Sequence, residues 1–193
     1  IASIMGYACG AQTGLANSAN TLAMKSEPGI YVEPLTPSQV TIMKGQNCNY
    51  YVQYNDFYNW FLDGVTCNGI FDDEITGLDQ LVANIQIACA DLLNSNPKIP
   101  QTDAGVSHLL NVISKACAES VRLGFLGAGT WNAPDIMSLR MGDAMPKGYV
   151  VQAQRVSDMT AADRSARKAP AIYASINPSG AIQQMTIGIY VNQ

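Results

Sequence analysis

The sequence predicts an α+β fold of α/β-like character, in which two long amphipathic helices pack on a mixed β-sheet. Apolar residues recur at helical spacing from Ile75 to Leu93 and again from Val106 to Val121. Several shorter segments alternate between apolar and polar residues, which is typical of half-buried strands. Each helix has a single apolar face, and a sheet is the surface that would cover both faces.

The first third of the chain predicts a short helix followed by a hairpin. Residues 1–30 are small, polar and interrupted by glycines, so they are expected to be a connecting stretch. Thr36–Gln39 combines a capping box with proline at the first helical position, which indicates a helix that ends near Gly45. Asn49–Tyr54 and Asn59–Val65 are predicted strands with their turn near Asn55–Asp56.

The two long helices have recognisable ends. Asp72–Glu74 places three acids in the first turn of one helix, and Asn94–Pro97 ends it. Thr102 or Asp103 caps the second helix, which ends at Gly124. Gly124–Pro146 is then loop-rich, with a short helix expected from Pro134 to Leu139.

The last fifty residues predict strands around one short helix. Tyr149–Val156 alternates as a strand, and Thr160 starts a helix that runs to Lys168. Ile172–Ile176 and Met185–Val191 also alternate, and Asn177–Gly180 between them has turn chemistry. We therefore expect a C-terminal β-hairpin or arm.

Composition excludes several classes of protein. Charged residues make up only 13% of the chain, about half of the ~25% usual in soluble domains, which suits a subunit covered by other subunits. A net charge of −4 argues against nucleic-acid binding, and no apolar run approaches the ~18 residues of a membrane span. The five cysteines lack metal or redox spacing, so free thiols in a reducing cytoplasm are expected. Because the chain starts at Ile1, we expect it to be the C-terminal part of a longer product.

Charge is unevenly distributed along the chain. Residues 1–97 carry two Lys or Arg against nine Asp or Glu, whereas residues 98–193 carry nine against six. From Cys48 to Pro97 there is no Lys or Arg at all. An acidic half and a basic half on one subunit favour head-to-tail association.

No candidate catalytic motif is persuasive. Ser165–Lys168 matches the Ser-x-x-Lys pattern of penicillin-binding serine enzymes, but the companion Ser-Asp-Asn and Lys-Thr-Gly motifs are absent, and a solvated basic helix explains the same residues. Asp72–Glu74 could bind a metal, yet helix capping is the simpler interpretation. His108 is expected on the surface. The tyrosines of Tyr50–Tyr54 could stack on bases or sugars, although sheet packing is favoured.

A series of motifs in a fixed order resembles contractile-tail sheath-like proteins of long-tailed bacteriophages, in their C-terminal or core region. The resemblance covers nearly the whole chain and rests on order and spacing together. The motifs are Glu27–Ile30, Leu35–Gln39, Asn47–Val52, Asp63–Val65, Asn68–Glu74, Gly77–Asp79, Lys98–Gly105, Gly148–Tyr149, Ala162–Pro170 and Ser179–Ile182.

The resemblance implies a virion structural protein without a cofactor or enzymatic activity. Such subunits form hexameric rings stacked helically around a tail tube, meet baseplate and terminator proteins at the ends, and contract to drive the tube into the host. Assembly in the host cytoplasm as part of the virion tail is expected. Residues 1–147 would be the sheath core domain, and residues 148–193 the tube-proximal part with the basic helix and the terminal hairpin or arm for exchange between subunits.

The resemblance also suggests roles for particular residues. Arg164, Arg167 and Lys168, at i, i+3 and i+4 of the short helix, are expected to share a face toward the tube. Two sets of residues are expected at subunit interfaces: the acids Asp72, Asp73, Glu74 and Asp79, and the arm residues Met185, Ile187, Ile189 and Val191. The alternatives are another tail protein (tube, terminator or baseplate component) and, more remotely, a Ser-x-x-Lys hydrolase.

Overall fold

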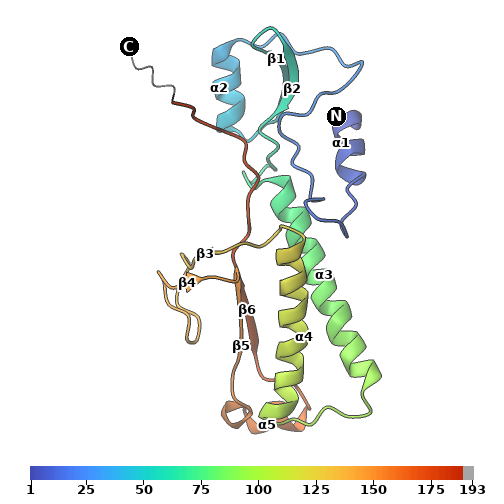
Figure 1. The fold of residues 1–193 in the computed structure, drawn as a ribbon, viewed down its shortest axis with the longest axis vertical. Coiled ribbons are helices and arrows are strands. Elements are labelled where there is room, and N and C mark those ends of the chain that lie inside the picture. The colour runs from blue at the N-terminus through green and yellow to red at the C-terminus, as the bar shows by residue number, and fades with distance from the viewer. Residues whose placement is uncertain (189–193) are drawn as a thin grey trace. The chain divides into compact units, whose positions relative to one another are not determined.

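The computed structural model describes residues 1–188, which form two compact units (Figure 1). Unit 1 contains residues 1–12, 19–76 and 180–188, and unit 2 contains residues 13–18 and 77–179. Each unit therefore combines segments that are far apart in the sequence. The expected division at residues 147 and 148 concerns roles in assembly and stays a prediction.

Unit 1 begins with a helix that the sequence analysis did not expect. α1 spans Ala2–Cys9 within the stretch expected to be a connection. A single internal glycine costs a helix only about 1 kcal/mol, and burial of Ile4 offsets that cost. The predicted short helix is α2, Pro37–Gly45, and its capping box is present: Thr36 accepts a hydrogen bond from the Gln39 amide, and the Gln39 side chain accepts one from the Thr36 amide.

The predicted hairpin of unit 1 is also confirmed. β1 (Tyr50–Tyr54) pairs antiparallel with β2 (Tyr58–Leu62), with Tyr54 opposite Tyr58. Asn55 and Asp56 have φ of 51° and 59°, a left-handed conformation that these residue types tolerate. An extended segment borders β2, because Phe61 bonds through its carbonyl to the Met24 amide and through its amide to the Lys25 carbonyl.

Unit 2 is built on the two long helices. α3 spans Asp72–Ser95, its first turn belonging to unit 1, and α4 spans Asp103–Arg122 with Thr102 as the N-cap. The remaining elements are β3 (Gly129–Thr130), β4 (Ala144–Met145), β5 (Tyr149–Ala153), the 3₁₀ turn Val156–Asp158, α5 (Ala161–Ser165) and β6 (Ile172–Ile176).

The core of unit 2 lies where both helices meet the β5–β6 pair. Leu81 of α3, Ile113 and Cys117 of α4, and Leu126 form a buried cluster. Half-buried residues of both strands pack against it, among them Val151 and Ile172. The α+β fold class and the shared sheet surface are therefore confirmed. Across residues 1–188 the strands form three two-stranded antiparallel sheets rather than one mixed sheet.

The predicted terminal hairpin is wrong in its pairing. β6 pairs with β5, in register from Tyr149 opposite Ile176 to Ala153 opposite Ile172. The chain does not turn back after β6, because the Asn177 amide donates to Gly148 and its side-chain amide donates to Gly127. Gly148 has φ +74°, and an added Cβ would lie 2.6 Å from the Gly127 carbonyl oxygen, so only glycine fits this crossing.

Candidate functional site

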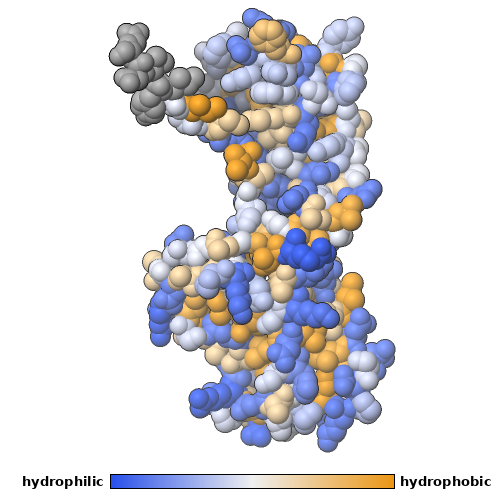
Figure 2. All heavy atoms as spheres, in the orientation of Figure 1, coloured by the Kyte–Doolittle hydropathy of each residue, from blue (hydrophilic) through white to orange (hydrophobic). Residues whose placement is uncertain are grey.

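The C-terminal arm, residues 180–188, is an exposed segment of unit 1 with several apolar side chains. Ile182, Met185 and Ile187 are 89%, 80% and 74% exposed, and no residue of the arm belongs to a strand. Figure 2 shows hydrophobic spheres along this arm where it leads to the grey residues. The expected interface residues Met185 and Ile187 are thus on the surface, and Ile189 and Val191 lie outside the described residues.

The arm is fixed to unit 1 at its base. The Gln183 side-chain amide donates to the Thr21 hydroxyl at 3.1 Å. The backbone amide of Ala181 lies near the carboxylate of Asp73, in the first turn of α3, and favours its charged form. Both contacts precede Met185, so the base of the arm is held while its apolar side chains stay exposed.

The four acids expected at an interface have different surroundings. Asp73 is only 8% exposed, Asp72 and Glu74 are half-buried, and Asp79 is exposed. Burial raises the pKa of Asp73, and the neighbouring charge of Asp72 adds to the increase, whereas hydrogen bonds from the amides of Asp73 itself and Ala181 oppose it. Asp73 therefore acts first within its own unit, as a partner of the arm.

The basic helix α5 is shorter than expected, which corrects the geometry of its cations. α5 ends at Ser165, and Arg167 has φ +56°. The amide of Arg167 bonds to the Arg164 carbonyl and the amide of Lys168 to the Asp163 carbonyl, the two bonds of a Schellman motif. The prediction that all three cations share one helical face is therefore wrong, because the chain leaves the helix before Arg167.

Within residues 1–188, only one of these three cations forms an ion pair. Lys168 lies 2.8 Å from Asp163, whereas Arg164 and Arg167 are exposed with no salt bridge to residues 1–188. The hydrogen bond that the Lys168 ammonium donates to Asp163 raises the pKa of Lys168, although a serine hydrolase would need a lysine of lowered pKa as its base. This geometry disfavours the Ser165–Lys168 hydrolase alternative.

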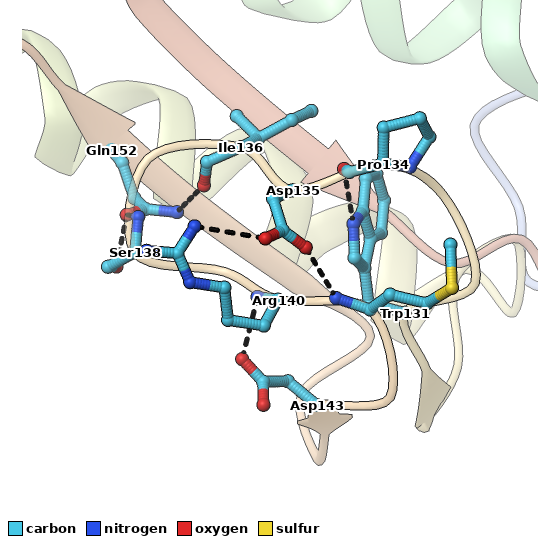
Figure 3. A network of polar contacts seen from close by, with 9 residues as sticks. Trp131, Pro134, Asp135, Ile136, Ser138, Arg140, Asp143 and Gln152 are labelled. Atoms are coloured by element: carbon cyan, nitrogen blue, oxygen red, sulfur yellow. Dashed lines mark hydrogen bonds and ion pairs between the residues drawn. The ribbon is translucent and has the colours of Figure 1, made fainter.

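A polar network orders the loop from Trp131 to Asp143, and the sequence analysis missed it (Figure 3). The Asp135 carboxylate accepts hydrogen bonds from the Arg140 guanidinium at 3.1 Å and from the Met141 amide at 3.0 Å. The side-chain oxygen of Gln152, Oε1, accepts hydrogen bonds from the backbone amide and the hydroxyl of Ser138. These side chains take amides that a helix would use, so the helix expected from Pro134 to Leu139 does not form.

The remaining candidates are structural. His108 is exposed as expected, and the five cysteines are free thiols. Among residues 1–188 no group of three or more His, Cys, Asp or Glu side chains could hold a metal ion. In the same part of the chain, no helix is both long and apolar enough to span a bilayer.

The comparisons with known proteins point to one family. The sequence model of the E217 tail sheath protein gp31-like C-terminal domain matches residues 72–191. No curated protein sequence matches the chain. Among solved structures, a chain of the cryo-EM structure of the anti-feeding prophage (AFP) baseplate superimposes with a TM-score of 0.64 at 12% identity. That comparison covers 98% of this chain but 48% of the other, so this chain spans about half the length of its structural relative.

Proposed function

The chain belongs to the family of E217 gp31-like tail sheath proteins, and from this premise we propose that it is a subunit of a contractile phage tail sheath. The family supports a structural role in a phage tail. In the finer proposal, copies of the subunit form stacked hexameric rings around a tail tube in the virion. Baseplate and terminator proteins meet the ends of the stack.

The observation that carries the proposal is the exposed apolar arm. A segment with three apolar side chains at least 74% exposed leaves apolar surface in water, and its backbone lies outside any described strand, so it is available to pair. Addition of such a segment to the sheet edge of a neighbouring subunit would satisfy its backbone and bury its side chains. Arms of this kind would keep subunits linked in every ring.

Contraction is then a shift between two packings of the same subunits. Because the base of each arm is attached to its own unit 1, the arms would keep neighbouring subunits joined while the other contacts between the subunits change. Arg164 and Arg167 supply cations for a weak contact with the tube. One exposed ion pair contributes only ~0–1 kcal/mol, so many copies could hold the tube and still release it.

Electron microscopy of the purified chain and of an arm deletion tests the proposal. Deletion of residues 183–193 should leave a folded subunit that forms no polymer. The control is Ile42→Ser, which removes an exposed apolar side chain, 60% accessible, from α2 of the same unit. Polymers of normal length from the deletion variant, or loss of polymers in the control, would contradict the role of the arm.

A second candidate is a baseplate component, since the structural relative comes from a baseplate assembly. The 12% identity of that relative supports only a shared fold. Electron microscopy also separates the candidates, because a sheath subunit forms long hollow polymers wide enough for a tube, and a baseplate subunit forms discrete rings.

A further inference from the structure

An open cleft of about 300 Å³ lies in unit 1 beside the β1–β2 hairpin. Aromatic residues form much of it: Tyr51 from β1, Tyr58 from β2, and Phe57 from the turn between them. Phe57 is 82% exposed, so a large apolar ring is left in water at this place. Ser26, Glu27, Pro28, Gly29, Ile30 and Asn59 complete the lining, and Glu27 is its only charged residue.

Glu27 is held by a rigid turn. The Ile30 amide bonds to the Glu27 carbonyl, with proline and then glycine between them, and Gly29 has φ +79°, as a type II turn requires. The Tyr51 hydroxyl accepts a hydrogen bond from the Glu27 amide at 3.0 Å and donates one to the Glu27 carbonyl at 3.3 Å. Ser26 donates to the Asn59 carbonyl at 3.0 Å. The position of Glu27 relative to the hairpin is thus fixed by three elements of unit 1.

The carboxylate of Glu27 has no partner among the residues that the structure describes. Glu27 is only 5% exposed, yet no residue among 1–188 donates a hydrogen bond or forms a salt bridge to its side chain. The cation closest in sequence, Lys25, has its ammonium 5.9 Å from the centre of the Tyr7 ring instead. The only enclosed side-chain oxygen or nitrogen without a hydrogen bond among residues 1–188 is the Ser175 hydroxyl, so the Glu27 carboxylate oxygens keep access to solvent, and a cation that enters the cleft can pair with them.

We propose that this cleft receives the side chain of an arginine or lysine from a second copy of the chain. A cation that lies against aromatic rings and beside a carboxylate gains from both, and a planar guanidinium does so better than an ammonium. The charges of the chain are complementary: Cys48–Pro97 contains no cation, whereas residues 98–193 are basic. Exposed cations without a salt bridge to residues 1–188 are Lys98, Lys115, Lys147, Arg155, Arg164 and Arg167.

The ligand of the cleft can be tested on the isolated subunit, whether or not the chain assembles. Amide chemical shifts of residues 26–30 and 57–59 are followed by NMR as N-acetyl-arginine amide is added, with the neutral citrulline analogue as the matched probe. We expect the arginine probe to bind the parent saturably with a millimolar dissociation constant. The citrulline probe should bind the parent at least about tenfold more weakly, and so should the arginine probe when it is added to Glu27→Gln. The control Glu33→Gln removes an exposed carboxylate nearby that does not line the cleft.

The stability of Glu27→Gln separates a binding role from a structural one. Because the Glu27 carboxylate makes no hydrogen bond or salt bridge to residues 1–188, its replacement by an amide should leave the melting temperature of the isolated subunit equal to the parent's or higher. A lower melting temperature would show that the carboxylate stabilises the free unit, and would overturn the proposal. Equal binding of the arginine and citrulline probes would overturn it too, because the cleft would then recognise shape or hydrogen bonds rather than charge.

The identity of the partner rests on the proposed function and has its own test. Glu27→Arg should abolish polymers, and a glutamate at one of the six cations listed above should restore them in the double variant. If none of the six restores assembly, the partner is not a second copy. If the parent itself forms no polymer while the arginine probe binds, the sheath proposal fails and the cation site stands.

Discussion

The two units differ in what their interiors contain. In unit 2 a continuous apolar cluster joins two helices and a strand pair, and its two buried polar residues, Ser120 and Ser175, are uncharged. In unit 1 the buried residues include two carboxylates, Glu27 and Asp73. Unit 1 is also tied together by hydrogen bonds between distant segments, such as the reciprocal pair between the Asn49 side chain and the Val65 backbone.

This difference suggests that the two units have different roles, unit 2 as a stable body and unit 1 as a binding surface. An apolar core gives a body that keeps its shape, since its stability does not depend on a partner. A buried carboxylate lowers the stability of the unit that contains it. Such a destabilising group is retained where another molecule or segment binds to it. Asp73 binds the base of the arm within the chain, and Glu27 lacks any such partner among residues 1–188. Four experiments, ordered by the size of their expected effects, test this contrast.

The largest effect is expected in the apolar core of unit 2. Leu81→Ala should lower the free energy of unfolding by about 3 kcal/mol, because Leu81 is 2% exposed at the centre of the cluster. Leu78→Ala on the same helix, where the side chain is 44% exposed, should cost under about 1 kcal/mol. Urea denaturation measures both. If Leu22→Ala in unit 1 cost as much as Leu81→Ala, the two interiors would not differ as argued.

A smaller loss is expected from a single hydroxyl in unit 1. Tyr51→Phe removes both hydrogen bonds to the Glu27 backbone and leaves the buried Glu27 amide without its partner, which should cost about 1–3 kcal/mol. Tyr54→Phe is the matched control, since Tyr54 is 52% exposed and its hydroxyl bonds to no residue among 1–188. Equal melting temperatures for the two variants would show that hydrogen bonding does not hold unit 1 together.

A gain of stability is expected at the end of α5 in unit 2. Arg167→Gly should stabilise the unit by about 0.5–1 kcal/mol, because glycine adopts φ +56° without strain. Arg164→Gly removes the same side chain from the helix proper and should destabilise by up to about 1 kcal/mol. Shifts of the same sign in thermal unfolding would contradict the assigned end of the helix. Strain retained at Arg167 would be consistent with a role for its charge in assembly.

The smallest effect concerns pH and distinguishes carboxylates of the two units. The native pKa of Asp73 is raised above 3.8, so the folded state binds its proton more tightly, and unfolding free energy falls as pH rises from 3.8 through the native pKa. Asp73→Asn removes this dependence. Asp163 of unit 2 has a lowered native pKa, caused by its hydrogen bonds to Lys168 and Thr160, so its contribution is lost as pH falls. Asp163→Asn should therefore shift the pH profile in the opposite direction.

Local signals in the sequence predicted most helices and the first hairpin. The capping box of Thr36 and Gln39, the N-cap of Thr102 and the turn at Asn55–Asp56 each depend on residues within a few positions of one another. Such signals act before tertiary contacts form, so a single sequence can reveal them. α1 was missed because glycine and small residues weaken the same signals, and burial of Ile4 compensates.

What the sequence could not predict depends on distant contacts. β6 and the terminal segment both alternate, and the crossing of Asn177 over Gly127 and Gly148 decides which strand β6 pairs with. The cleft around Glu27 unites residues from three separate segments, and the sequence showed its glutamate only as the first residue of the family motif Glu27–Ile30. Asp135 of the loop network lies in the segment predicted as the helix Pro134–Leu139, and its bond to the Met141 amide leaves no signature in the sequence.

Because Cys117 is completely buried, the reactivity of its thiol reports transient opening of the apolar core of unit 2. The thiol is 0% exposed, and burial raises its pKa, so the reactive thiolate is scarce as well as shielded. An alkylating reagent can reach it only during transient openings of the apolar cluster. Cys9 and Cys67 of unit 1 are exposed and react without such an opening. The ratio of the two labelling rates thus reports how often unit 2 opens, in the free subunit or in any assembly that contains it.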